Sequence, residues 1–315
     1  MHGGGPPVGR CVAGRTEGVL PARGRRRGGP FLALVGATVS DLYKPPLFEI
    51  RGVTFAYPGR PPSLEEVSFT VRKGERVALL GANGSGKTTL LLLLDGLYFP
   101  QGGRIDFEGN PIEAHSLEDG EAVRHFRRRV GLLFQNPDAQ LFSPSVREEL
   151  LFAPRQLGLP SEEAEERVET VLNLMEISDL RDRPPQSLST GEKKRVALAS
   201  LLTAGPSVLL LDEPTAGLDP RSQSRLLDIL EQLHGAGLTL ITATHELLLL
   251  PHLADRAVVL SPGHRLLAEA PADEVLSDLA LLDRANLIHI HSHRHGDVLH
   301  RHPHLHWAGH HHEEP

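Results

Sequence analysis

Alternating segments and short apolar runs, separated by Gly and Pro, dominate the middle of this 315-residue chain. Residues Phe48–Tyr57 and Leu64–Val71 alternate between apolar and polar positions, which is the pattern of half-buried strands. Continuously apolar runs, which are typical of buried parallel strands, lie at Arg76–Leu80, Val208–Leu211, Leu238–Thr242 and Ala257–Leu260. The pattern over residues 47–286 therefore predicts one α/β unit.

The pattern becomes helical and charged between about residues 140 and 190. Ser161 is followed by Glu162 and Glu163, which predicts a helix with Ser161 as its N-cap and an acidic first turn. We interpret this stretch as a helical insertion within the sheet unit.

The two ends of the chain have a different composition. Residues 1–46 are rich in Gly, Pro and Arg. We interpret them as a disordered extension, or as the result of a start codon assigned too far upstream. A basic arm that touches nucleic acid or lipid is the alternative. Residues 287–315 contain eleven of the eighteen histidines, and we interpret them as a flexible, low-complexity tail that does not fold alone.

Composition narrows the class of protein. The formal charge is -7, which gives no reason to expect nucleic acid as a partner. Cys11 is the single cysteine, so the chain cannot form an intramolecular disulfide, as suits a reducing compartment. No apolar stretch approaches the roughly 20 residues that cross a bilayer. If the protein works at a membrane, we expect it to dock there through a partner.

One glycine-rich segment has the residue types that a phosphate-binding loop needs, in the order Gly81-Ala82-Asn83-Gly84-Ser85-Gly86-Lys87-Thr88. A buried strand precedes it and an apolar helix follows, so this context fits as well. The glycines let backbone N–H groups approach phosphate oxygens, and the helix N-terminus favours the same anion. The alternative is a chance glycine-rich turn, which the flanking elements make improbable.

A second strand ends in two acidic residues, Asp212 and Glu213. At the carboxyl edge of a parallel sheet, Asp212 would hold Mg²⁺ through water. Glu213 could polarise an attacking water molecule. A solvated acidic pair that ends a strand is the alternative.

Further motifs between and after these two sites occur in the order of the ABC ATPase family, which the chain resembles over about residues 47 to 280. The resemblance implies a P-loop ABC ATPase fold, with an antiparallel β subdomain and an inserted α-helical subdomain. It rests on the stretches similar to the Q-loop, signature, D-loop and H-loop, which are Phe134–Pro137, Leu188–Arg195, Ala216–Pro220 and Thr244–Glu246.

The resemblance also implies a role for each motif residue. Glu213, His245 and Gln135 would be catalytic, and Thr88, Gln135 and Asp212 would hold Mg²⁺. His245 would also hydrogen-bond the γ-phosphate and brace Glu213. The ATP contacts of one copy would be Tyr57, which stacks on adenine, and Gly81, Asn83, Gly84, Ser85, Gly86, Lys87, Thr88, Thr89 and Asp212. Ser189 and Gly191 would reach the ATP of a second copy.

The signature motif departs from the family pattern at two positions. The usual Leu-Ser-Gly-Gly-Gln has become Leu188-Ser189-Thr190-Gly191-Glu192. Thr190 adds a side chain where the backbone would approach phosphate, at the expected contact between the two copies.

The stretch from Gln135 to Val146 resembles the ATPases of energy-coupling factor importers, as does the tail Asp273–Leu287. The resemblance implies a peripheral protein at the cytoplasmic face of the cell membrane. Its partners would be a transmembrane coupling subunit, a substrate-binding membrane subunit and a second ATPase copy, most simply an identical one. The solute would be cobalt or nickel ions. The alternatives are a vitamin importer or a soluble, non-transport ABC ATPase.

The histidine tail bears on the solute because imidazole suits Ni²⁺, Co²⁺, Zn²⁺ and Cu²⁺. The candidate ligands recur at every second position within two runs, and they are His289, His291, His293, His295, His300, His302, His304 and His306. Two interpretations remain open. The tail either binds metal or is a low-complexity segment without a function.

Overall fold

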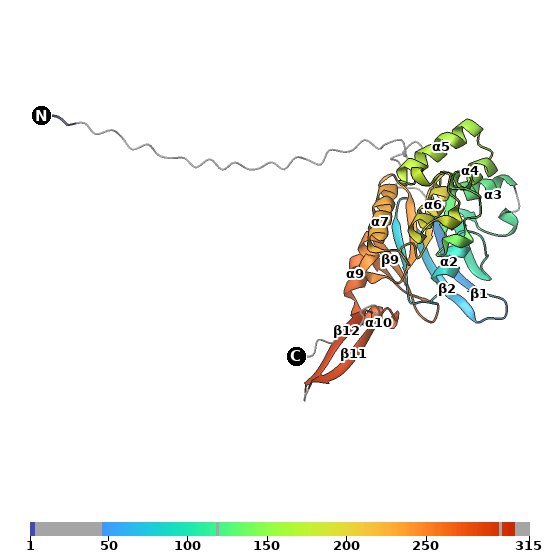
Figure 1. Cartoon of the computed structure of the whole chain (residues 1–315). Helices are drawn as coiled ribbons and strands as arrows, with labels where there is room; N and C mark the ends of the chain where they lie inside the picture. Colours follow the sequence, from blue (N-terminus) through green and yellow to red (C-terminus); the bar gives the residue numbers. More distant parts are fainter. Residues whose placement is uncertain (4–45, 118–119, 296–297, 306–315) are drawn as a thin grey trace.

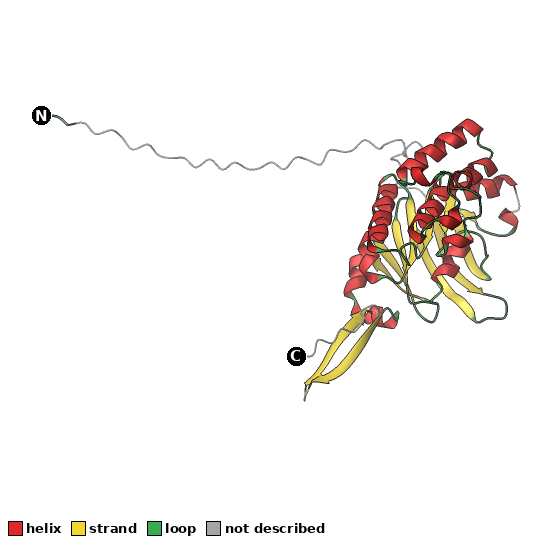
Figure 2. Ribbon diagram, in the orientation of Figure 1, coloured by secondary structure: helices red, strands yellow, loops and turns green. Residues whose placement is uncertain are grey.

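The computed structural model describes residues 1–3, 46–117, 120–295 and 298–305, with side chains described as far as residue 288 in the C-terminal part. Its body is built on two sheets, with helices packed around them (Figures 1 and 2). The strands are β1 (Phe48–Ala56), β2 (Pro62–Val71), β3 (Arg76–Leu80), β4 (Gly102–Phe107), β5 (Asn110–Pro111), β6 (Val130–Leu133), β7 (Val208–Asp212), β8 (Thr239–Thr244), β9 (Arg256–Leu260), β10 (Leu266–Pro271), β11 (Ile288–His295) and β12 (Val298–Leu305).

The first sheet is antiparallel, in the order β2-β1-β4-β5. The alternating segments predicted as strands form β1 and β2, and their apolar positions are buried while several polar ones are exposed. The alternation therefore reflects a sheet with one face on the core.

The second sheet has the order β10-β9-β3-β8-β7-β6. Strands β9, β3, β8, β7 and β6 run parallel, and β10 pairs with β9 as an antiparallel edge. All five residues of β7 and all six of β8 are buried, as the continuous apolar runs predicted. The carboxyl ends of β3 and β7 therefore lie on the same edge of this sheet, where the phosphate loop and Asp212 are found.

Helices cover the parallel sheet. They are α2 (Lys87–Leu94), α3 (Gly120–Arg129), α4 (Val146–Gln156), α5 (Ser161–Leu174), α6 (Thr190–Leu202), α7 (Pro220–Gly235), α8 (Leu250–Leu253), α9 (Ala272–Ser277) and α10 (Leu279–Arg284). Short 3-10 turns lie at His115–Leu117, Pro137–Ala139, Ser178–Leu180, Pro185–Ser187 and Leu247–Leu249. Helices α4 and α5 lie in the stretch predicted as a helical insertion.

Helix α2 carries Lys87 and lies inside the molecule. Its leucines form one core with the inner faces of both sheets. A second core joins α4, α5, α6 and α7 to the other face of the parallel sheet. A helix that is apolar all round must be surrounded by protein, so the phosphate loop is fixed between two rigid layers.

The start of α5 differs in one detail from the prediction. Ser161 is the first helical residue, and Pro160 occupies the N-cap without a side-chain hydrogen bond. Pro160 has no N–H and a fixed φ, so it can precede a helix without leaving an unsatisfied donor. The acidic first turn, with Glu162 and Glu163, is present as predicted.

The histidine-rich segment also differs from the prediction of a flexible tail. Ile288–His295 and Val298–Leu305 pair as a two-stranded antiparallel hairpin that extends from the body beside α10 (Figure 1). The period of two in this segment is the physical reason, because alternation suits a strand. His306 and nearly all of residues 1–46 lie outside the described residues. Among the helices that are described, none is both long and apolar enough to cross a membrane.

Candidate functional site

The loop between β3 and α2 has the backbone geometry of a phosphate cradle. Gly84 and Gly86 have positive φ angles of 82° and 105°. A Cβ at Gly86 would lie 2.4 Å from the carbonyl oxygen of Ser63 and 2.8 Å from a methyl carbon of Leu64. Only glycine fits here, because any side chain would clash with β2 as well as strain the backbone. The loop is therefore fixed by its packing against β2 as well as by the backbone preferences of its own residues.

Lys87 is the first residue of α2, directly after the loop, and is 6% exposed. Its Nζ donates to the carbonyl oxygens of Gly81 at 2.8 Å and Ala82 at 3.1 Å, and lies 3.7 Å from Glu213 Oε1. Burial lowers the pKa of Lys87, while the carboxylates of Glu213 and Asp212 oppose that shift. The loop thus holds a partly desolvated positive charge against the carbonyl oxygens of Gly81 and Ala82.

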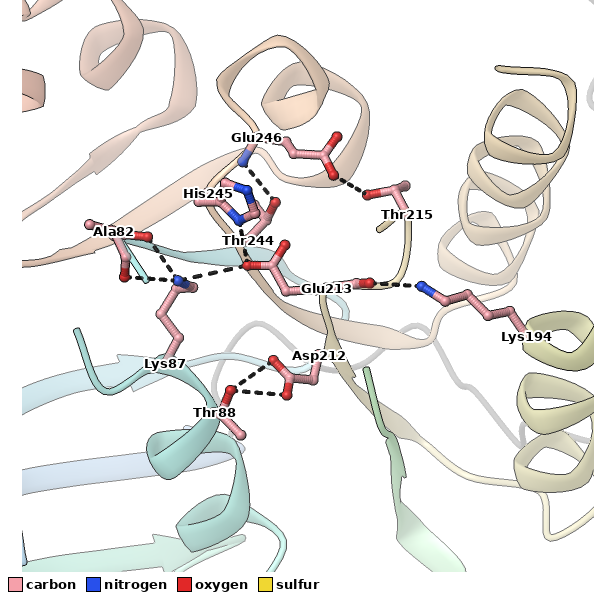
Figure 3. Close-up of polar contacts among 11 residues, drawn as sticks. Ala82, Lys87, Thr88, Lys194, Asp212, Glu213, Thr215, Thr244, His245 and Glu246 are labelled. Carbon is pink, nitrogen blue, oxygen red and sulfur yellow. Dashed lines mark hydrogen bonds and ion pairs between the residues drawn. The ribbon is translucent and has the colours of Figure 1, made fainter. Parts of the chain in front are cut away.

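Thr88 and Asp212 meet beside this charge. Thr88 Oγ1 lies 3.1 Å and 3.0 Å from the two carboxylate oxygens of Asp212 and donates to them (Figure 3). Burial raises the pKa of Asp212, and its hydrogen bond with Thr88 opposes that shift. A hydroxyl and a carboxylate fit Mg²⁺, which commonly takes few protein oxygens and completes its shell with water and phosphate.

Glu213 follows Asp212 and has a strained backbone. Its φ is +45°, a value that non-glycine residues rarely adopt and that clusters at functional sites. Glu213 Oε1 lies 2.8 Å from His245 Nδ1, whereas Oε2 is buried with no hydrogen-bond partner among the residues that the structure describes. One carboxylate oxygen is therefore held and the other is free to accept a proton or a hydrogen bond from a bound molecule.

Lys194 is a site residue to which the motif reasoning gave no role. It lies in the middle of α6 but is only 2% exposed, and burial lowers its pKa to about 8. Its Nζ donates to the carbonyl oxygen of Glu213 at 3.0 Å (Figure 3). It also donates to the carbonyl oxygens of Pro214 at 2.9 Å and Ala216 at 2.7 Å. The three hydrogen bonds of the Lys194 ammonium group thus hold the segment from Glu213 to Ala216 in place.

Most of the predicted site residues surround one cavity of about 580 Å³. The cavity is lined by the predicted residues Tyr57, Asn83, Gly84, Gly86, Lys87, Thr88, Thr89, Gln135 and Glu213. The structure therefore brings together residues that are up to 156 positions apart in the sequence (Tyr57 to Glu213).

Tyr57 belongs to an aromatic cluster at this cavity. Its ring stands edge-on to Phe55 and Tyr98, with centroids 5.1 Å and 5.4 Å away. Its hydroxyl lies 3.3 Å from Thr89 Oγ1. The cluster fixes the ring at the cavity wall, as a flat ligand would need.

Sequence reasoning missed the remaining lining residues of this cavity, Arg60, Pro61, Pro62, Ser63 and His264. His264 lies in the turn between β9 and β10 with φ +62°, and its Nδ1 is buried without a hydrogen-bond partner among the described residues. Only the Pro-Gly turn before it could have suggested its position, and nothing in the sequence suggested its proximity to the phosphate loop.

Ser189 and Gly191 lie elsewhere. Ser189 caps α6 in a reciprocal box with Glu192, and both line a separate groove with Arg195, Arg221, Ser222 and Arg225. A Cβ at Gly191 would lie 2.9 Å from Ser222 Oγ, so glycine allows α6 to approach α7. Within one chain, the signature residues therefore do not face the phosphate loop's cavity.

The two positions at which the signature motif departs from the family pattern both lie at the exposed start of α6. Thr190 is exposed as the first residue of α6. Glu192 Oε2 accepts from the backbone N–H of Ser189 at 2.7 Å, which lowers the pKa of Glu192. Glutamate at this position therefore closes the capping box, a role that favours the ionised carboxylate.

Comparison with known proteins agrees with this geometry. Residues 64–216 match the ABC transporter family. The nickel import ATP-binding protein NikO of Rhodobacter capsulatus is 51% identical over 246 residues, which are 77% of this chain and 96% of that protein. The cobalt import ATP-binding protein CbiO of the same organism is 46% identical over 242 residues, 77% of this chain and 85% of that protein.

A solved structure is similar over the same length. The cbiO1 protein from Clostridium perfringens, part of the ABC transporter complex cbiONQ, has 34% sequence identity and a TM-score of 0.66. The match covers 77% of this chain and 95% of that chain.

Proposed function

The chain belongs to the ATP-binding proteins of ABC transporters, and from this premise we propose that it is the ATP-hydrolysing subunit of an energy-coupling factor importer for cobalt or nickel ions. In this proposal it works as a homodimer at the cytoplasmic face of the membrane. It acts there on a transmembrane coupling subunit and a substrate-binding membrane subunit. The relatives named for nickel and cobalt import support the choice of solute.

One observation carries the mechanism. The phosphate loop, Asp212, Glu213 and His245 are gathered in one place, whereas Ser189 and Gly191 line a different groove. A complete site then needs the signature residues of a second copy. Because only the closed dimer would complete both sites, ATP favours closure by its differential affinity for that state.

Each residue has a chemical task in this proposal. Backbone N–H groups of the loop and Lys87 bind the phosphates of ATP. Thr88, Asp212 and Gln135 would hold Mg²⁺, which would supply neutralisation of the phosphate charge. Glu213 accepts a proton from the attacking water, and His245 keeps its carboxylate in position.

An exposed aromatic pair marks the surface for the transmembrane coupling subunit. Phe142 and Phe152 are 62% and 44% exposed, with ring centroids 4.9 Å apart. The buried carboxylate of Glu149 accepts from the backbone N–H groups of Phe142 and Ser143, which fixes the loop. A rigid aromatic pair in the open is typical of a protein interface.

This surface is linked to α6, and so to the signature residues. Gln140 Nε2 donates to the carbonyl oxygen of Ala197 at 3.1 Å, and Lys193 Nζ lies 2.7 Å from Asp138 Oδ1. The segment after Gln135 therefore moves with α6, which gives nucleotide-driven closure a route to the membrane subunits.

Replacing Phe142 and Phe152 with alanine tests this surface. We expect the double variant to retain ATP hydrolysis by the isolated chain, because neither ring lines the ATP cavity. Each ring lost from an interface centre costs about 2 kcal/mol or more, so co-purification with membrane subunits of the nickel or cobalt systems should fall strongly. Replacing the exposed Leu279, which lies on α10, is the matched control. Full assembly of the double variant would contradict the proposed surface.

The solute is tested by exchange of subunits. We expect this chain to restore nickel or cobalt uptake in Rhodobacter capsulatus cells that lack NikO or CbiO, since it spans most of each protein's length. Radiolabelled metal taken up per cell is the measurement, and the Glu213→Gln chain is the inactive control. A chain that assembles with the membrane subunits and hydrolyses ATP but moves neither metal would instead favour a vitamin importer. A chain that assembles with none would favour the non-transport alternative.

A further inference from the structure

The hairpin β11–β12 pairs histidine with histidine. In its register, His289 lies opposite His304, His291 opposite His302, and His293 opposite His300. Directly opposed residues of antiparallel strands lie on the same face, and residues two apart on one strand share that face. The register therefore places six histidines in three consecutive cross-strand pairs on one face.

The other face has a different composition. Its register pairs are Ile288 with Leu305, Ile290 with Pro303, Ser292 with Arg301, and Arg294 with Leu299. None of these eight residues is a histidine. A random histidine-rich segment would distribute its histidines between the two faces. In this register, the paired histidines all lie on one face.

The spacing of these pairs suits a metal ion. Opposed Cα atoms in an antiparallel pair are about 4.5–5.5 Å apart, and the next pair along lies about 7 Å away. Two neighbouring pairs thus bring four imidazole-bearing positions within reach of one centre, and imidazole is a preferred ligand of Ni²⁺, Co²⁺ and Zn²⁺. We propose that this histidine face of β11–β12 binds a divalent transition-metal ion through neighbouring cross-strand pairs.

The base of the hairpin connects this site to the body of the protein. Leu287 and Ile288 are buried in the core that contains Leu80, the residue before the phosphate loop, and Ala257 of β9. A lone two-stranded hairpin is marginally stable in water. A metal that binds only the paired strands would stabilise them by mass action. The proposal does not depend on which solute the importer moves.

A variant with unchanged composition tests the register. The exchanges L299H, H300L, R301H and H302R retain all eighteen histidines but move two from the histidine face to the other face. Only the pair His289–His304 then remains. With Ni²⁺ as the probe, we expect the full-length variant to bind about tenfold more weakly, or worse, than the original chain in equilibrium dialysis. A chain with His115, His125 and His252 replaced by glutamine controls for histidines outside the hairpin and should bind as the original does.

Amide hydrogen exchange gives a second readout of the same experiment. Ni²⁺ should slow exchange over residues 288–305 in the original chain and not in the exchanged variant. Equal Ni²⁺ affinity of the two chains would overturn the proposal, since binding would then follow histidine content and not register. Slowed exchange in neither chain would also overturn it. ATP hydrolysis by both chains, measured without metal-transport partners, separates these results from any failure of the importer function.

Discussion

Replacing Glu213 with glutamine is expected to lower ATP turnover by about a hundredfold or more and to leave ATP-bound chains accumulating as a dimer. The amide is nearly isosteric, so the arrangement of Glu213 beside His245 and Lys87 should survive. What is lost is the carboxylate oxygen that accepts a proton from water in the proposed mechanism. Turnover is measured by phosphate release, and the dimer by size-exclusion chromatography with ATP and Mg²⁺.

Lys87→Met supplies the contrasting control. That variant lacks the charge that faces the phosphates, so it should bind ATP weakly and remain a monomer. A Glu213→Gln chain that binds ATP and yet stays monomeric would contradict the two-copy site. If it turned over ATP at the original rate, Glu213 would lose its assigned role.

Replacing Lys194 with methionine is expected to destabilise the fold and slow turnover together. The change leaves the carbonyl oxygens of Pro214 and Ala216 without the Lys194 donor, while that of Glu213 keeps only the backbone N–H of Ala216 at 3.1 Å. Each unsatisfied buried acceptor costs about 1–3 kcal/mol, so the free energy of unfolding should fall by about 2 kcal/mol or more. Since the same bonds fix the strained backbone at Glu213, we also expect kcat to fall about tenfold or more at temperatures where the variant is folded.

The neighbouring lysine is the matched control for this prediction. Lys193 pairs with Asp138 near the surface, and surface pairs contribute about 0–1 kcal/mol. Lys193→Met should therefore change the unfolding free energy little. Denaturant unfolding gives the stabilities, and ATP titrations separate kcat from KM. A folded Lys194→Met chain with unchanged kcat would reduce Lys194 to a purely structural residue.

The residues that chemistry demands at fixed local spacing were predictable from the sequence. The loop Gly81–Thr88 and the pair Asp212–Glu213 follow the ends of buried strands, and the structure places both at one edge of the sheet. Tyr57 and Gln135 required the family resemblance, because a lone aromatic or glutamine has no informative pattern. The same resemblance suggested the contact between His245 and Glu213, which the structure contains.

Contacts that depend on packing were not predictable in the same way. Lys194 looks like an ordinary charged helix residue, and its burial arises only when α6 packs on the segment after β7. His264 reaches the cavity from the turn between β9 and β10, although it lies more than 170 residues from the phosphate loop in the sequence. The hairpin differs from these contacts, because an alternation of histidines fits both a spacing of metal ligands and a strand.

The several attachments of α6 have a quantitative consequence. The helix is capped by Ser189, holds the carbonyl oxygen of Glu213 through Lys194, and is hydrogen-bonded to Gln140 at Ala197. If these contacts make one two-state element, nucleotide and membrane subunits bias the same equilibrium. Thermodynamic reciprocity then requires that the factor by which the coupling subunit changes ATP affinity equals the factor by which ATP changes affinity for the coupling subunit. A titration in either direction would give the same coupling free energy.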